Sequence, residues 1–181
     1  MQKLYFITGN KNKFEELKYI LPSVEQLDID LPEIQEIDPQ LIIKNKLLEA
    51  LNHAKGEFIV EDTGLYLECL NGLPGPLVKW FLKTIGKEGL ARIVEYYKND
   101  RAEARTMIGY AKNHEEMYFF EGALKGRIIS PKGESNFGWD PIFLPDGYLK
   151  TFAEIGNEEK NKISMRSIAV NKLKEFLGRI N

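Results

Sequence analysis

The sequence has very few of the residues that build the commonest metal centres and covalent catalytic sites. Its 181 residues include one cysteine, Cys69, and two histidines, His53 and His114, which are far apart in the chain. A single cysteine excludes an internal disulfide and a cysteine-based metal cluster. Two distant histidines argue against a zinc site or a Ser-His-Asp arrangement. Neither class of site is therefore expected.

The chain also lacks a marked net charge and a long apolar run. Its 25 basic and 27 acidic residues give a net charge of −2, which argues against the basic face that duplex nucleic acid requires. A small polyanion in a local basic cleft remains compatible with this charge. No apolar run approaches the length of a membrane span, and no signal-type segment stands before the first expected strand. We therefore expect no nucleic-acid or membrane partner and a cytoplasmic location.

Length and composition are those of an ordinary soluble globular protein. The chain is 43% hydrophobic and 29% charged, close to the usual balance for this class. Its length suffices to bury a core without disulfides or metals. We expect a single domain over residues 1–181, in one piece or with two lobes.

What the sequence does contain is a strand, a turn and a helix within residues 4–21. Leu4–Thr8 is short and apolar, as in a buried strand, and the apolar residues from Phe14 to Leu21 recur at helical spacing. Between them, Gly9 permits a sharp turn, and Lys11 and Lys13 follow at a helix start that attracts anions. These are the parts of a phosphate site. The alternative is a capped turn with solvated lysines, because no P-loop or Gly-x-Gly-x-x-Gly pattern is present.

Two groups of carboxylates are candidate ligands for a hard cation. The first is an acidic run over residues 28–38 that includes Glu33; such runs are commonly solvated loops, but one carboxylate of this run can turn inward. The second follows the expected strand Phe58–Val60, where Glu61 and Asp62 stand before Thr63-Gly64. Here the alternative is a turn without a ligand role.

Further along the chain, turn signals divide several expected helices and strands. Asp38-Pro39 is a typical N-terminal cap of a helix that should run to about Lys55, with Lys44 at the edge of its apolar face, either in water or in a cleft. The rigid loop 71–76 opens a helix that carries Lys79, and a second helix follows Gly86. Ala102–Ala111 and Met117–Ile129 are expected to form an antiparallel hairpin.

An aromatic loop, Phe137-Gly138-Trp139-Asp140-Pro141, allows two interpretations. Its rings can stack on a flat base, while the carboxylate and amides contact the edge of that base. They can equally fill the core, which is the commoner place for Phe and Trp. Lys160, Lys162 and Arg166 then cluster before and within the last helix.

Six segments in this order resemble one family, the inosine triphosphate pyrophosphatases of the Ham1 type, which act on noncanonical purine nucleoside triphosphates. The resemblance runs from Thr8 to about Leu173 and rests on TGNKNK, LPEIQ, EDTGL, GLPGPLVKWFL, FGWDPIF and EEKNKIS. It implies an α/β fold, two-lobed and mixed, with a long twisted central sheet and a nucleotide cleft between the lobes. It also implies a homodimer.

The resemblance further implies an activity and a cofactor. Members hydrolyse ITP, dITP and XTP to the monophosphate and pyrophosphate with Mg²⁺, which keeps deaminated purines out of DNA and RNA. Two alternatives stay open: a pyrophosphatase for another modified nucleotide, and a nucleotide-sensing module without turnover.

Site residues follow from the same resemblance, position by position. Glu33 and Asp62 are implied metal ligands, and Asp62 is also the candidate catalytic base. The implied substrate contacts are Thr8, Gly9, Asn10, Lys11, Asn12, Lys13, Lys44, Thr63, Lys79, Phe137, Gly138, Trp139, Asp140, Lys160, Met165 and Arg166.

One position departs from the family pattern, which usually reads Ser-His-Arg where this chain has Ser164-Met165-Arg166. Met165 cannot donate the hydrogen bond that histidine can, whereas Arg166 keeps a forked set of donors suited to a purine carbonyl. The departure affects the expected base preference rather than the expected hydrolysis.

Overall fold

A mixed sheet of seven strands with helices forms the protein, whose computed structural model describes residues 3–135 and 138–180. The chain divides into two compact units. The first comprises the residues up to Asp62, Thr106–Gly122 and the chain from Met165 onward; the second comprises Thr63–Arg105 and Ala123–Ser164. Strands β3 (Glu57–Leu67), β5 (Arg101–Ala111) and β6 (Met117–Ile128) contribute residues to both units. Each unit is described by itself below.

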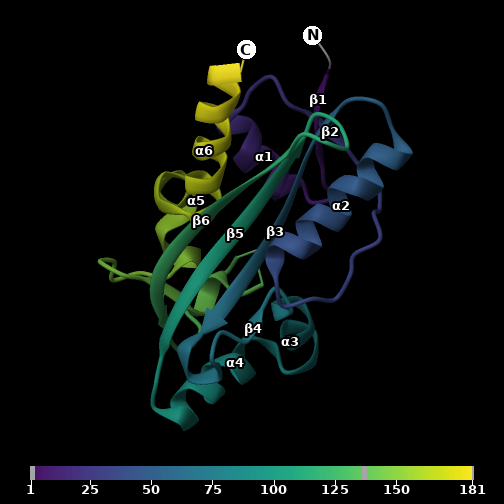
Figure 1. Cartoon of the computed structure of the whole chain (residues 1–181). Coiled ribbons are helices and arrows are strands. Elements are labelled where there is room, and N and C mark those ends of the chain that lie inside the picture. The colour runs from purple at the N-terminus through teal and green to yellow at the C-terminus, as the bar shows by residue number, and fades with distance from the viewer. Residues whose placement is uncertain (1–2, 136–137, 181) are drawn as a thin grey trace. The chain divides into compact units, whose positions relative to one another are not determined.

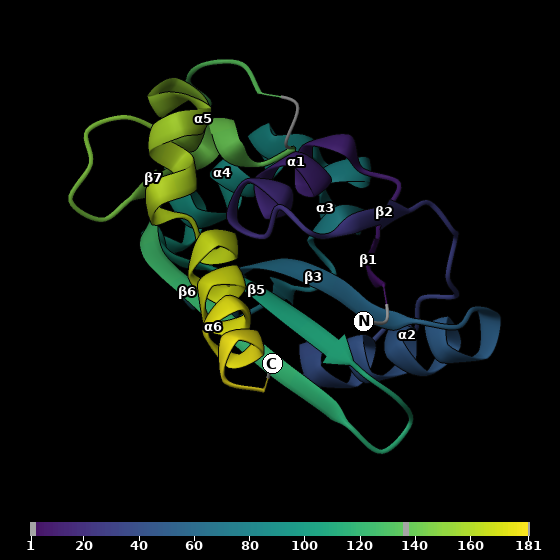
Figure 2. The same cartoon turned by 90° about the horizontal axis from the view of Figure 1, so that it is seen from above.

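In the first unit, β1 (Leu4–Ile7) pairs in parallel with β2 (Glu25–Leu27) and with β3. The helices of this unit are α1 (Lys11–Ile20), α2 (Pro39–His53) and α6 (Met165–Ile180). Figures 1 and 2 show strands of the sheet between α2 and the α1–α6 pair. Alternate side chains of β3 enter two separate cores, which accounts for this arrangement: Ile59 packs with α1 and α6, while Phe58 and Val60 pack on α2.

Local capping fixes where α1 and α2 begin. The Asn10 side chain accepts a hydrogen bond from the Lys13 amide at 3.1 Å, and the Asp38 side chain accepts one from the Gln40 amide at 2.8 Å. Pro39 occupies the first turn of α2, where its missing N–H costs nothing. The expected helix starts after the glycine turn and after Asp38 are therefore confirmed.

Two glycines allow helices of the first unit to lie close to the sheet. A Cβ at Gly109 of β5 would be 2.3 Å from the Ile43 side chain of α2. A Cβ at Gly122 of β6 would be 1.9 Å from the Met165 carbonyl oxygen and 2.7 Å from the Ala169 amide of α6. The start of α6 is therefore packed directly on the backbone of β6.

The second unit contains β4 (Pro74–Gly75) beside β3, β7 (Phe143–Pro145) beside β6, and helices α3 (Val78–Thr84), α4 (Gly86–Tyr97) and α5 (Phe152–Ile163). Both new pairings are antiparallel. A buried aromatic cluster forms its core: the Trp139 ring lies 5.5 Å from Phe143 and 6.2 Å from Phe152, measured between centroids. The Trp139 ring therefore packs in the core, which is one of the two positions expected for the rings of the aromatic loop. The other ring, that of Phe137, lies outside the described residues.

The structure also corrects one expected element. The sequence predicts a short strand over Phe58–Val60 that ends before Glu61, but β3 continues without interruption to Leu67. Gly64 explains the difference, because a Cβ there would be 2.8 Å from the Gly75 backbone of β4. A glycine inside a strand can mark such a close backbone approach rather than a turn. In the described part of the chain, no helix has the length and apolar character needed to cross a membrane.

Candidate active site

The candidate site is built on two consecutive carboxylates of β3, Glu61 and Asp62. Side chains of a strand alternate between the faces of a sheet. Because Ile59 faces α1 and α6, and Val60 faces α2, Glu61 must face α1 and α6 and Asp62 must face α2. The ion pairs described next have this arrangement.

On the α2 side, one lysine reaches two carboxylates. Lys46 Nζ lies 2.7 Å from Glu33 Oε1 and 3.9 Å from Asp62 Oδ1. The same nitrogen donates a hydrogen bond to the Glu61 carbonyl oxygen at 3.3 Å. Glu33 comes from the acidic run and Asp62 from β3, so carboxylates from separate segments converge on a single cationic position.

Of the two carboxylates near Lys46, that of Asp62 has the weaker contact with the lysine. The Asp62 side chain is 12% exposed, and its Oδ2 is buried without a hydrogen-bond partner in the part of the chain that the structure describes. Burial raises the pKa of the Asp62 carboxyl above its ordinary value, and the charges of Lys46 and Lys13 only partly offset this effect. A buried carboxylate oxygen without a donor is available to a metal ion or to water.

The donors around Lys46 suit a hard divalent cation. Among residues 3–135 and 138–180, no three His, Cys, Asp or Glu side chains are grouped closely enough to enclose a metal ion. Mg²⁺ does not require such an enclosure, because it is usually held by one or two carboxylates and completes its shell with water and phosphate oxygens. Glu33 and Asp62 supply two carboxylates, one of them with the buried Oδ2.

On the opposite face, Glu61 is held by two cations. Arg166 of α6 forks onto it, with Nε 2.7 Å from Oε2 and Nη2 3.0 Å from Oε1. Lys13 Nζ of α1 lies 2.9 Å from Oε1, and Arg166 Nη1 also donates to Glu16 of α1. Although burial alone would raise it, the charges of Arg166 and Lys13 lower the pKa of Glu61 to about 2. Glu61 is therefore ionised at neutral pH.

A cavity of about 150 Å³ brings these groups to one place in the first unit. Its lining includes Thr8, Lys13, Glu33, Lys46 and Glu61. The residue before the glycine turn, the acidic run, α1, α2 and β3 therefore all contribute to the cavity, and its lining includes both cationic and anionic side chains. This is the chemistry of a site that holds a cation and a polyanion together.

Several residues of the turn remain at the surface. Gly9, Asn10, Lys11 and Asn12 are exposed, whereas Thr8 and Lys13 are half-buried. Of the side chains of the turn, those of Thr8 and Lys13 line the cavity.

The structure adds a second lysine of α2 to the site. Lys44, which the resemblance places at the phosphates, is exposed and stays a prediction, whereas Lys46 reaches Glu33 and Asp62. Two residues correspond to about 200° around a helix, so the two lysines leave α2 in nearly opposite directions. Met165 is buried, with 2% of its surface exposed, and its contact with the base stays a prediction.

The other predicted contacts belong to the second unit. Asp140 and Lys160 form a buried ion pair, with Nζ 2.5 Å from Oδ2, and Ser135 donates a hydrogen bond to the same oxygen at 3.0 Å. Gly138 and Lys79 are exposed, and Lys79 Nζ lies 5.9 Å from the centroid of the Trp80 ring. Thr63 is half-buried at the point where β3 enters this unit.

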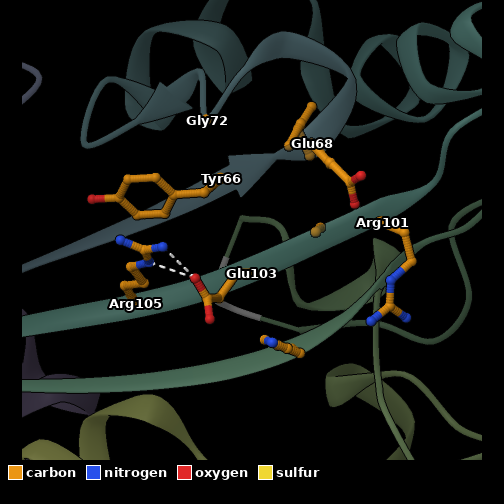
Figure 3. A pocket seen from close by; sticks show the side chains of 9 residues that line it. Tyr66, Glu68, Gly72, Arg101, Glu103 and Arg105 are labelled. Atoms are coloured by element: carbon orange, nitrogen blue, oxygen red, sulfur yellow. Dashed lines mark hydrogen bonds and ion pairs between the residues drawn. The ribbon is translucent and has the colours of Figure 1, made fainter.

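A larger cavity, of about 280 Å³, lies in the second unit and is shown in Figure 3. Both arginines of its lining are held in ion pairs. Arg105 binds Glu103 through Nε at 2.6 Å and lies 4.6 Å from the Tyr66 ring centroid, and Arg101 forks onto Asp146. None of the residues predicted from the sequence lines it, so the smaller cavity of the first unit is the better candidate.

Local sequence patterns do not identify two charged residues of the site, Glu16 and Lys46. They mark Glu61 as a candidate cation ligand or a turn residue, because they do not predict that β3 continues past it. Glu16 sits in α1 three residues after Lys13, a spacing that places both on one helix face. No local pattern distinguishes Lys46 from Lys44.

Comparison with known proteins identifies the family. A model of the Ham1 family matches residues 4–176. The inosine triphosphate pyrophosphatase of Schizosaccharomyces pombe is 41% identical over 181 residues, covering 98% of this chain and 96% of that protein. The enzyme of the same name from Puccinia graminis f. sp. tritici is 38% identical over 188 residues, covering 98% and 97%.

Solved structures agree with these sequence matches. The Ham1 protein of Staphylococcus aureus superposes with a TM-score of 0.79 at 25% identity, covering 99% of this chain and 100% of that one. A HAM1 protein from Coxiella burnetii gives a TM-score of 0.80 at 25% identity, with the same coverage. The fold is thus the mixed α/β fold of the solved Ham1 proteins. This chain belongs to the Ham1 family.

Proposed function

We propose that this protein hydrolyses noncanonical purine nucleoside triphosphates, such as ITP, dITP and XTP, to the monophosphate and pyrophosphate. The observation that carries the proposal is the convergence of Glu33 and Asp62 on the ammonium group of Lys46. Glu33 and Lys46 line a cavity together with Thr8 and Lys13. Two relatives named inosine triphosphate pyrophosphatases, 41% and 38% identical over nearly the whole chain, support it. The corresponding biological role is to keep deaminated purines out of DNA and RNA.

Glu33 and Asp62 are the residues that would hold the divalent ion, for which Mg²⁺ is the proposal. When bound, Mg²⁺ neutralises phosphate charge and assists departure of pyrophosphate. The orphan Oδ2 of Asp62 supports this assignment, since a buried carboxylate oxygen without a donor gains most from a cation.

The chain itself supplies charge and proton transfer for attack of water on the α-phosphorus. Lys13 and Lys46 would bind phosphate oxygens, and the amides at the start of α1 add positive potential that is already in place before the reaction. Asp62 would orient the attacking water and accept its proton. Because a carboxylate bound to a metal ion is a weak base, the ligand role and the base role of Asp62 compete.

The family resemblance assigns recognition of the base to Phe137, Gly138, Trp139, Asp140, Lys160 and Arg166. We propose the same assignment, with the ring of Trp139 packed in the core. A donor that faces the 6-keto oxygen of a deaminated purine is left unpaired by the 6-amino group of adenine. Each such unpaired group costs roughly 1–3 kcal/mol, or about one to two decades of discrimination. Two such terms would suffice to spare ATP.

The remaining parts of the proposal concern the state of the protein in the cell. We propose a homodimer located in the cytoplasm. The two alternatives from the sequence are kept as outcomes of the test: a pyrophosphatase for another modified nucleotide, such as a modified pyrimidine, and a nucleotide sensor without turnover.

The test is steady-state hydrolysis of ITP, XTP, dITP, GTP, ATP and a panel of modified pyrimidine triphosphates, with pyrophosphate and monophosphate both quantified. The proposal expects equal amounts of pyrophosphate and IMP from ITP, and much slower release from ATP and GTP. Preference for a pyrimidine would favour the first alternative. Nucleotide binding without any release would favour the second, and release of inorganic phosphate with IDP would contradict the reaction type.

A further inference from the structure

The buried carboxylate of Glu61 has no place in the proposed hydrolysis, although it lies beside the candidate metal ligand. Its residue is 5% exposed, and its face of the sheet is the one opposite Asp62. A carboxylate this deeply buried is retained only when cations hold it. It therefore calls for a role of its own.

The Glu61 carboxylate contacts two of the cationic side chains to which the proposed function gives substrate roles. Arg166, proposed for the base, forks onto both oxygens at 2.7 and 3.0 Å, and Lys13, proposed for the phosphates, lies 2.9 Å from Oε1. Glu16 accepts from the remaining arm of Arg166. Two acids and two bases form this cluster, so its formal charge is zero.

The geometry points to Glu61 as a positioning residue that fixes Lys13 and Arg166 together, and so links the phosphate end of the site to its base end. The inference rests on the proposed function. Lys13 illustrates why such a device is useful: its flexible four-carbon stem gives it many rotamers in solution. The Glu61 carboxylate, on the central strand β3, holds the Lys13 side chain in one rotamer before the substrate binds, which is preorganisation.

Glu16 differs from Glu61 in a way that makes the inference testable. It is joined to Arg166, whereas Glu61 is joined to both Arg166 and Lys13. Because Arg166 belongs to the base end, we expect removal of the Glu16 charge to act there. Removing the charge of Glu61 should disturb both ends.

The experiment compares Glu61→Gln, Glu61→Asp and Glu16→Gln with a matched control, Glu15→Gln, which makes the same charge change at an exposed position of α1. Two quantities are measured for each variant. The dissociation constant of inorganic tripolyphosphate, obtained by calorimetry, reports the phosphate end without turnover. The ratio of kcat/KM values for ITP and ATP reports the base end.

For Glu61→Gln we expect tripolyphosphate binding to weaken about tenfold and the ITP-to-ATP ratio to fall about tenfold, as for one lost charge-assisted hydrogen bond at each end. Glu16→Gln should lower the ratio alone, and Glu15→Gln should change neither quantity. Glu61→Asp, which keeps the charge but withdraws it by one methylene, should lie between the wild type and Glu61→Gln in both.

An unchanged ratio together with unchanged tripolyphosphate binding in Glu61→Gln would overturn the inference, as would a tripolyphosphate effect of the same size in Glu16→Gln. If circular dichroism shows that Glu61→Gln does not fold, Glu61→Asp becomes the deciding variant. In that case the inference is overturned if Glu61→Asp changes neither tripolyphosphate binding nor the ITP-to-ATP ratio. A wild type that does not hydrolyse ITP contradicts the proposed function instead. The calorimetric arm still tests the Lys13 contact in that case.

Discussion

Glu61 and Asp62 are consecutive residues of β3 whose carboxylates lie on opposite faces of the sheet. Glu61 is bound by Arg166 and Lys13, which bring its pKa to about 2, whereas burial raises the pKa of Asp62. Strand alternation thus gives two neighbouring acids opposite environments. We expect Glu61 to hold cationic side chains in place and Asp62 to bind metal and act on water.

The first prediction concerns Asp62→Asn. The change removes the candidate base and one ligand charge, so pyrophosphate release should be abolished while nucleotide binding stays measurable. The ligand-free variant should also be more stable, because a buried carboxylate with an unpartnered oxygen becomes a neutral amide. A gain of about 0.5–2 kcal/mol in the free energy of unfolding is typical when a functional residue that destabilises the folded protein is replaced.

Urea denaturation and pyrophosphate release from ITP check this prediction on the same preparation. Substantial remaining turnover would remove Asp62 from the catalytic residues. A less stable variant would mean that Asp62 is well compensated in the ligand-free protein.

The second prediction decides between the two lysines of α2. Lys46→Met should lower kcat/KM for ITP by about 10- to 100-fold, since it removes the charge beside Glu33 and Asp62. Lys44→Met changes an exposed side chain of the same helix and should have a much smaller effect. The opposite order would restore the assignment that the sequence alone suggests.

The third prediction tests the packing that positions α6. Gly122→Ala places a methyl group where the Met165 carbonyl oxygen would be 1.9 Å away, so it should lower the free energy of unfolding by about 1–3 kcal/mol or more. Gly178→Ala, inside α6 with nothing within 4 Å, should raise it by about 0.5–1 kcal/mol through helix propensity.

Thermal melts of the two variants give the answer directly. Equal effects of the two alanines would show that α6 is not packed tightly on β6. Because Arg166 follows Met165, Gly122→Ala should also reduce the preference for ITP over ATP.

The fourth prediction concerns Met165, where the family usually has histidine. Met165→His restores a hydrogen-bond donor and should increase the ratio of kcat/KM values for ITP and ATP. Since the methionine is 2% exposed, the introduced ring must find a partner inside the protein, and a moderate loss of stability is expected. An unchanged ratio would refute a role of this position in base preference.

Much of the fold could be predicted from local patterns. The strand at Leu4, the helix starts at Lys11 and Pro39, and the neighbouring long strands β5 and β6 all follow from periodicity, capping residues and turn chemistry. The end of β3 could not be predicted, since Gly64 is equally suited to a turn and to a strand that another backbone approaches. Only the pairing with β4, a contact distant in sequence, decides between the two.

The site shows the same limit. The order of the motifs indicates Glu33, Asp62 and Lys13 as site residues. In the structure Glu33 and Lys13 line one cavity, and the Asp62 carboxylate lies 3.9 Å from Lys46, which lines the same cavity. Lys46 was missed because both lysines of α2 satisfy the helix pattern, and the choice depends on where the acidic run passes. Trp139 could be a platform or a core residue from sequence, and its neighbours Phe143 and Phe152 decide for the core.

The most direct test of the central claim is pyrophosphate release from ITP and from ATP, measured for the wild type and for Glu33→Gln with and without Mg²⁺. We predict release from ITP that requires Mg²⁺, exceeds release from ATP by about 100-fold in kcat/KM, and is strongly reduced in Glu33→Gln. Release that is independent of Mg²⁺, insensitive to Glu33→Gln, or equal for the two nucleotides would contradict the account.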